Sequence, residues 1–181
     1  MTRAGPATRE RIQTVARELF AQKGVQRTSL QDIANRLGIT KPALYYHFSS
    51  REDLVRSILQ PLIDEGESFV AEHERRRRAA RAAPRELLEG YFDFHFRHRA
   101  DLVLVVEELT TLADLGLIDV MLAWRERLCK LVFGSRPTLK QSTRAVIAFG
   151  GLQDCCLQFP DAGYDQLKKA TVDGAMAALG L

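Results

Sequence analysis

Apolar side chains recur along this chain at intervals of three and four residues, with polar and charged side chains between them. The stretch from residue 29 to residue 37 gives an example, because one helix face collects Leu30, Ile33, Ala34 and Leu37. No segment has the sustained alternation of apolar and polar residues that marks a half-buried strand. The pattern therefore predicts an all-α fold of about nine helices.

Glycine and proline divide this pattern into separate helices. Gly24 ends the first predicted helix, whose apolar stripe runs from Ile12 to Phe20. A fourth helix starts close to Ser50 and contains Pro61, which either kinks it or breaks it in two. Turn residues place five later helices over residues 84–99, 101–115, 118–133, 138–159 and 164–179.

The second and third predicted helices are short and lie close together in the sequence. Thr28 with Gln31 has the spacing of a capping box, which favours a helix start near residue 29. Gly38 follows the last apolar position, and Thr40 is placed to cap the next helix, over residues 41–48. So short a connection forces a steep crossing of the two helices. The segment therefore reads as a helix-turn-helix that sets its second helix in a DNA major groove.

The second of these helices leaves an unusual surface exposed. Leu44 and Phe48 would anchor it to the core, and the outward positions hold Lys41, Ala43, Tyr45, Tyr46 and His47. Residues 1–60 contain ten Lys and Arg against five Asp and Glu, a net charge of +5, whereas the whole chain carries +3 and the remainder −2. A basic first third favours DNA as its partner, although an excess of a few charges is common on solvated surfaces.

The same stretch resembles the DNA-binding segment of the TetR (tetracycline repressor) family. The elements that match the family pattern are Thr28, Asp32-Ile33-Ala34, Leu37-Gly38-Ile39, Leu44-Tyr45, Phe48 and Arg51-Glu52-Asp53-Leu54. They cover the first third of the chain. The resemblance implies an N-terminal three-helix DNA-binding domain, residues 1–50, followed by a helical ligand-binding and dimerisation domain, residues 51–181.

The resemblance also implies how each residue would contact DNA. Lys41 would contact base edges, with Ala43 against a thymine methyl group and Tyr46 at the groove wall. Phosphates would be contacted by Thr28, Tyr45, His47 and Arg51. The full predicted DNA-binding set is Thr28, Lys41, Pro42, Ala43, Tyr45, Tyr46, His47 and Arg51.

Small residues concentrate in the last two predicted helices. Gly150 and Gly151 each cost roughly 1 kcal/mol relative to alanine within a helix, which is more easily tolerated where another backbone comes close. We interpret these helices as a two-fold dimer interface formed by Ala145, Phe149, Gly150, Leu167, Thr171, Ala175 and Ala178. Packing of the two helices within one chain would explain the same pattern.

Aromatic residues are frequent in the middle helices, where the resemblance implies a ligand cavity. The predicted lining comprises Phe69, Tyr91, Phe92, His95, Leu102, Glu108, Thr111, Trp124, Leu128 and Gln153. Each aromatic residue taken singly is better explained by core packing. Collectively they suggest a largely apolar effector, and carboxylates in the same helices, such as Glu107 and Asp114, favour a cationic group on it.

Three chemical alternatives are weaker. His95 and His98, with Asp93 nearby, have no further ligands to complete a metal site. Cys155 and Cys156 are adjacent in an apolar helix, where cysteine usually serves as a small inert apolar residue rather than a redox sensor. The sequence has no phosphate-binding loop, serine elbow or zinc-protease motif. We therefore expect neither an enzyme nor a cofactor.

These features together predict a homodimeric, ligand-responsive transcriptional regulator, most simply a repressor of a pseudo-palindromic operator. The alternative is a constitutive architectural DNA-binding protein without a ligand, whose C-terminal cavity would be filled by side chains. The resemblance implies that ligand binding would move the fourth helix and change the separation of the two recognition helices. The arginine run at residues 75–81 is expected to be a solvated helix end or loop. With no long apolar segment, the protein is expected in the cytoplasm and away from membranes.

Overall fold

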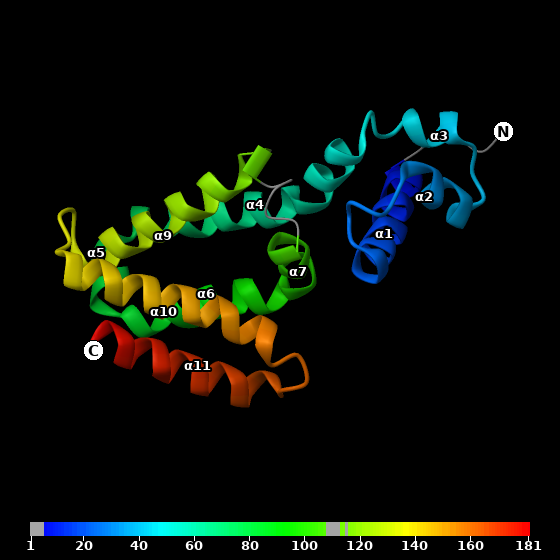
Figure 1. Cartoon of the computed structure of the whole chain (residues 1–181). Coiled ribbons are helices and arrows are strands. Elements are labelled where there is room, and N and C mark those ends of the chain that lie inside the picture. The colour runs from blue at the N-terminus through cyan, green and yellow to red at the C-terminus, as the bar shows by residue number, and fades with distance from the viewer. Residues whose placement is uncertain (1–5, 108–112, 115) are drawn as a thin grey trace. The chain divides into compact units, whose positions relative to one another are not determined.

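The computed structural model describes residues 6–107, 113–114 and 116–181, and every secondary-structure element in these ranges is helical (Figure 1). The chain divides into two compact units. The N-terminal unit comprises residues 1–61 and 103–116, and the C-terminal unit comprises residues 62–102 and 117–181. This division places residues 51–61 with the N-terminal helices, and the predicted domain boundary after residue 50 stays a prediction.

The N-terminal unit contains α1 (Pro6–Lys23), α2 (Leu30–Leu37), α3 (Lys41–Tyr45) and the first part of α4 (Arg51–Arg75). Its core is built from apolar side chains of all four helices and of the turns between them. The completely buried members include Ile12, Phe20, Ile33, Leu44, Phe48, Leu54 and Ile58. This core fixes how α2 and α3 cross, and therefore which face of α3 reaches solvent.

Local chemistry explains where α2 starts and ends. The capping box forms one residue later than predicted: Ser29 accepts from the backbone N–H of Asp32, whose carboxylate accepts from the backbone N–H of Ser29. Gly38 ends the helix with φ of +65°, a left-handed conformation that other residues adopt only with strain. The prediction for Gly38 is therefore confirmed, and the prediction of Thr28 as the cap is wrong.

Helix α3 is shorter than the predicted span of residues 41–48. Thr40 caps it as expected, because its hydroxyl accepts from the backbone N–H of Ala43 at 3.3 Å. After Tyr45 the chain tightens into a turn in which the N–H of His47 donates to the carbonyl oxygen of Leu44 at 2.9 Å. Leu44 and Phe48 are both fully buried, so the turn carries the chain back to the core.

The C-terminal unit contains the second part of α4, then α5 (Arg77–Ala82), α6 (Pro84–Arg97), the start of α7 (Arg99–Glu107), α9 (Leu117–Phe133), α10 (Leu139–Gln158) and α11 (Tyr164–Leu179). Helices α10 and α11 lie side by side, and α6 packs against both of them (Figure 1). Its core includes Leu62, Leu88, Phe92, Leu128, Phe149, Leu152 and Leu179.

Three predicted boundaries in this part of the chain need correction or completion. Helix α4 continues through Pro61 as one helix, so of the two alternatives predicted at this proline the break is excluded. The arginine run contains the short helix α5, whose described side chains are mostly exposed. Helix α7 ends at Glu107, whereas its predicted span of residues 101–115 extends into residues outside the described ranges.

Candidate DNA-binding face and buried cavity

The exposed face of α3 collects most of the predicted DNA-binding residues. Lys41, Pro42 and Ala43 are exposed, as is Tyr45, and Tyr46 has a relative exposure of 77%. An aromatic side chain held so far into solvent gains nothing from folding and suits contact with another molecule. The fully buried Leu44 fixes the orientation of this face.

A hollow of about 300 Å³ lies beside this face, between the start of α2, α3 and the start of α4. Its lining includes Ser29, Gln31, Lys41 and Tyr45. The ammonium nitrogen of Lys41 stands 5.7 Å from the centre of the Tyr45 ring. With Arg51 and Glu52 also in its lining, the hollow combines two cations and several hydroxyl groups with one carboxylate. The cations and hydroxyl groups suit a phosphate.

Thr28 and Arg51 also line this hollow, and both side chains make hydrogen bonds within the protein. Thr28 is fully buried, and its hydroxyl donates to the carbonyl oxygen of Gly24 at 2.9 Å. Arg51 donates to the carbonyl oxygen of Gln26 at 3.0 Å and to that of Val25 at 3.3 Å. Both side chains therefore hold the loop before α2, which is a structural task that the sequence prediction did not foresee.

His47 occupies an intermediate position. Its ring is partly buried and meets the ring of Tyr46 edge to face, with 5.4 Å between their centres. Its carbonyl oxygen accepts from Arg9 at 2.8 Å, and the Arg9 guanidinium lies 4.2 Å from the centre of the Phe48 ring. Arg9 thus ties α1 to the turn after α3.

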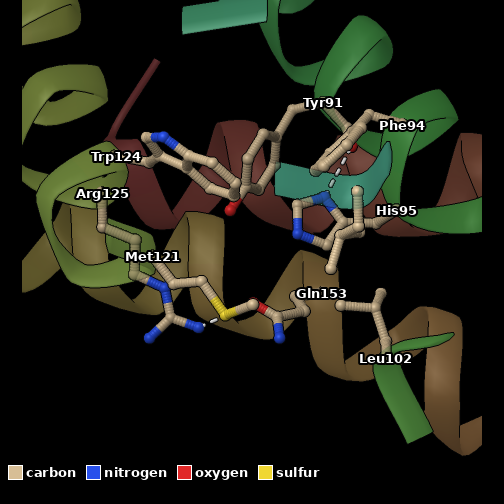
Figure 2. Close-up of a pocket in the computed structure, with 9 residues that line it drawn as sticks. Tyr91, Phe94, His95, Leu102, Met121, Trp124, Arg125 and Gln153 are labelled. Atoms are coloured by element: carbon tan, nitrogen blue, oxygen red, sulfur yellow. Dashed lines mark hydrogen bonds between the residues drawn. The ribbon is translucent and has the colours of Figure 1, made fainter. Parts of the chain in front are cut away.

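A buried cavity lies within the C-terminal unit (Figure 2). It is lined by Leu62, Tyr91, Phe94, His95, Leu102, Met121, Trp124, Arg125 and Gln153. Its volume is about 10 Å³, which is room for about one water molecule. In this structure the side chains therefore fill most of the space that an effector would need.

Half of the predicted cavity lining meets at this place, namely Tyr91, His95, Leu102, Trp124 and Gln153. Phe69, Phe92 and Leu128 do not line this cavity, and their part in a ligand site stays a prediction. Phe69 lies against His73 and Tyr91. Phe92 is fully buried and faces Phe96 and Tyr164 instead, and Leu128 is fully buried away from the cavity. Glu108 and Thr111 lie outside the described residues.

Polar groups in the cavity are arranged around Arg125. Its guanidinium donates to the side-chain oxygen of Gln153 at 2.7 Å, as Figure 2 shows. The Nδ1 atom of His95 lies 2.9 Å from the carbonyl oxygen of Tyr91 and donates to it. Burial lowers the pKa of His95 to about 4, so the ring is neutral at neutral pH and its Nε2 atom is an acceptor. Burial also raises the pKa of Tyr91 to about 12, although the nearby positive charge of Arg125 acts to lower this pKa.

Trp124 connects this cavity to α4. Its indole N–H donates to Glu67 at 3.0 Å, and Arg127 binds both Glu67 and Glu74 at 2.7 Å. Gly66 stands directly under the indole ring, where any Cβ atom would overlap it. We call Gly66, Glu67, Glu74, Trp124 and Arg127 the α4–α9 clamp. Hydrogen bonding to Arg127 lowers the pKa of both glutamates, so the clamp is charged at neutral pH.

Comparison with known proteins identifies the N-terminal unit. Residues 12–58 match the family model described as bacterial regulatory proteins, tetR family. A transcriptional regulator from Aquifex aeolicus VF5 shares 25% of the sequence with a TM-score of 0.73, covering 94% of this chain and 98% of that chain. The N-terminal unit belongs to the TetR family.

Among curated TetR relatives, the repressor KstR2 of Mycolicibacterium smegmatis is 31% identical over 123 residues, 65% of this chain and 58% of its own length. The activator FasR of the same organism is 35% identical over 86 residues, 48% of this chain and 39% of its own length. The chain thus spans about half the length of the curated relatives it matches. These relatives are transcriptional regulators and not enzymes, and they include both an activator and a repressor.

The TetR fold places the predicted dimer residues mainly inside the chain. Ala145, Phe149, Leu167, Thr171 and Ala175 are buried within one subunit. Phe149 lies against Tyr91 of α6, and Ala145 lines a hollow between α9 and α10. The intramolecular explanation therefore accounts for these five, and Gly150 and Ala178 are partly exposed. The outer face of α10 instead carries Ile147, 63% exposed, beside Gly150 and Gly151, where an added Cβ atom would meet no other atom.

The metal and redox alternatives find no support in the described part of this protein. Asp93 accepts from Tyr164 and Lys168, and His98 pairs with Glu65 at 2.8 Å, so these side chains do not converge with His95. No group of three His, Cys, Asp or Glu residues there is placed to hold a metal ion. Burial raises the pKa of the Cys156 thiol to about 12, which disfavours the reactive thiolate. No helix within the described ranges is long and apolar enough to cross a membrane.

Sequence reasoning missed Met121 and Arg125, which line the cavity. The signal was present, because Met121, Trp124, Arg125 and Leu128 follow at the spacing of one helix face. A charged residue among three apolar neighbours on one face marks a buried or half-buried charge, and Arg125 is such a residue.

Proposed function

We propose that this protein is a transcriptional regulator that binds a pseudo-palindromic DNA operator as a homodimer in the cytoplasm. The observation that carries the proposal is the face of α3, where Lys41, Ala43 and Tyr46 are exposed while Leu44 is buried. This face is mounted on a unit whose first sixty residues have a net charge of +5. A recognition helix on a rigid mount uses exposed cations and hydroxyl groups to contact phosphates and base edges, and Lys41 and Tyr46 offer such groups.

A homodimer would present two such faces, one for each half of the operator. The outer face of α10 around Ile147, Gly150 and Gly151 supports this assembly, because its small residues admit a close approach by another helix. The predicted interface residues Gly150 and Ala178 would contribute from its edge. The other five would act indirectly, through the packing of α10 and α11 within the subunit.

A small effector would release the DNA by acting on α4. The cavity is lined by Trp124, which contacts α4 through Gly66 and Glu67. A ligand that displaces the indole ring would shift this helix, which continues through Pro61 into the N-terminal unit. The ligand can change DNA binding only as far as its affinity differs between the two positions of α4.

Selection of bound duplexes from random DNA tests the proposal. The full chain is expected to enrich an inverted repeat whose half-sites lie a whole number of DNA turns apart. Enrichment of a single unrepeated site would contradict a dimer, and absence of any enrichment would contradict specific DNA binding. A variant with Tyr46→Ala and Lys41→Ala together is the control, and it should enrich no sequence.

A constitutive architectural DNA-binding protein is a second candidate. The cavity volume of about 10 Å³ favours it, because side chains already occupy the site. This candidate predicts that no small molecule reduces operator binding. Screening apolar compounds for release of the selected operator separates the two functions.

A further inference from the structure

Arg125 lies between two hollows of the C-terminal unit. It lines the buried cavity, where its guanidinium binds Gln153, and it also lines a larger groove between α9 and α10. We call this the α9–α10 groove, and its lining is Leu122, Arg125, Glu126, Cys129, Lys130, Pro137, Ser142, Ala145 and Val146. The groove has a volume of about 420 Å³, which lies within the range of about 300–1,000 Å³ that is usual for small-molecule sites.

The groove is apolar along most of its length. Leu122 and Val146 are 54% and 57% exposed on its two sides, and Ala145 lies buried beneath them. Large apolar side chains that stay in solvent around a hollow of this size favour an apolar occupant. The buried cavity, with about 10 Å³, does not offer comparable space.

Arg125 differs from the other cations of α9 in its partners. Arg127 binds two carboxylates at 2.7 Å, and Lys130 pairs with Glu126 at 2.5 Å. Arg125 makes no ion pair with any residue that the structure describes. Its guanidinium donates to the neutral amide of Gln153 at 2.7 Å and also interacts with the neutral phenol of Tyr91. A half-buried guanidinium that has five N–H donors and meets neutral acceptors alone among the described residues is poorly compensated.

We propose that the α9–α10 groove binds an apolar monocarboxylate, with its carboxylate on the guanidinium of Arg125 and its apolar body along Leu122, Ala145 and Val146. This inference rests on the proposed function, since it names the class of the effector. A carboxylate matches the planar fork of arginine through two parallel hydrogen bonds. A single anionic group suffices, because the charge of Lys130 is already neutralised by Glu126.

The inference reverses the expectation of a cationic effector. That expectation came from acidic residues in the middle helices. Glu126 is the single carboxylate among the groove-lining residues, and it is occupied by Lys130. Asp114 is exposed and lies outside the groove, and the side chain of Glu107 is not described. The groove-lining charge that has no oppositely charged partner among the described residues is the positive charge of Arg125.

Titration calorimetry of the full chain without DNA tests the inference. The probes are decanoate, decanol and decyltrimethylammonium, which share an apolar body and differ in charge. Decanoate is expected to bind one molecule per chain, roughly tenfold or more tightly than either of the other two. Equal affinity for decanoate and decanol would overturn the role of Arg125, and tighter binding of the ammonium compound would overturn the ligand class.

Two variants and a matched control locate the site. Arg125→Gln should weaken decanoate binding roughly tenfold or more and leave decanol binding unchanged, whereas Arg136→Gln removes the same charge from an exposed turn and should change neither. Val146→Asp should also weaken decanoate binding, because it puts a negative charge in the groove. A wild-type affinity in either groove variant would overturn the proposed site.

The experiment also separates other outcomes. If Val146→Asp converts a dimer to a monomer in sedimentation and decanoate does not bind the wild-type chain, the groove is covered by a second copy and the inference fails. Because no DNA is present, loss of decanoate binding and loss of operator binding are measured independently. A chain that binds its operator but none of the probes keeps the proposed function and refutes the ligand class.

Discussion

Lys41 and Leu44 lie three residues apart at neighbouring positions on the surface of α3, yet Lys41 is exposed and Leu44 is fully buried. Leu44 is fully buried, so the helix cannot rotate without exposing it, and Lys41 is thereby held in solvent beside Tyr45. The burial of one residue thus determines the orientation of the other. A single substitution at Lys41 therefore tests its role in DNA recognition.

Lys41→Ala is expected to lower specific operator affinity by about 1 to 3 kcal/mol while leaving the fold intact, because it removes a cation that reaches the bases or the phosphates. Titration of a labelled operator measures the loss, and circular dichroism checks the fold. Lys140→Ala removes the same charge from an exposed position of α10 and serves as the control. Unaltered affinity in Lys41→Ala would exclude Lys41 from recognition.

His95 gives a second prediction for a single residue. Burial lowers its pKa from 6.5 to about 4. The unfolded chain therefore binds a proton between these values that the folded chain does not, and stability falls as the pH drops from 6.5 toward 4. From about pH 7.5 to about pH 5, the contribution of this one group to the free energy of unfolding should fall by about 2 kcal/mol. Urea denaturation of wild type and His95→Gln measures it, and an equal pH dependence in both would refute the assignment.

At the scale of helices, α4 and α9 are held together by the α4–α9 clamp. Gly66 allows the indole ring of Trp124 to lie on the backbone of α4, and Arg127 binds the two glutamates on either side of that contact. The contact combines close packing with a partly shielded ion pair network. A change at Gly66 should therefore act through Trp124 and not through helix propensity.

Gly66→Ala would raise helix propensity by about 1 kcal/mol, yet its methyl group would overlap the indole ring. We expect a net destabilisation of about 1 to 3 kcal/mol from the forced separation of the two helices. Thermal or urea unfolding measures it. In a Trp124→Leu background the same change should cost much less, and an equal cost in both backgrounds would show that the contact is not responsible.

At the scale of the whole molecule, the two units differ in charge and in exposed surface. The first sixty residues carry +5 and the remainder −2, so attraction to DNA is concentrated at one part of the chain. The C-terminal unit instead leaves an apolar strip of α10 in solvent, around Ile147. This strip is the surface on which we place self-association.

Ile147→Glu is expected to convert a dimer to a monomer, because it would bury two negative charges against the two-fold axis. Sedimentation at micromolar concentration measures the mass. Ala123→Glu, at an exposed position of α9, is the matched control and should remain dimeric. A wild-type chain that sediments as a monomer, or an Ile147→Glu chain that stays dimeric, would contradict the interface.

The helices could be predicted from the sequence because their determinants are local. The spacing of Ile33 and Leu44, the left-handed glycine at Gly38 and the cap at Thr40 all act within one or two turns of helix. The cap of α2 was misplaced by one residue because Thr28 and Ser29 have the same chemistry. Burial of Thr28 under the end of α1 decides between them, and burial depends on the fold.

The cavity could be predicted only in part, because it depends on which helices meet. Tyr91 and Phe92 are adjacent aromatic residues on α6, yet one lines the cavity and the other faces Phe96 and Tyr164. The two side chains leave the helix in directions about 100° apart. Which direction points to the cavity depends on where the neighbouring helices lie. The free volume depends on all these side chains together and has no signature in the sequence.

The position of Trp124 has a practical consequence, since it is the single tryptophan of the chain. Its indole ring lies on Gly66, donates to Glu67 and lines the buried cavity, so one chromophore senses both α4 and the cavity. Intrinsic fluorescence excited at the indole band should therefore report a displacement of α4 without any label. Trp124 is thus an intrinsic fluorescent probe at the contact through which we propose that an effector acts on α4.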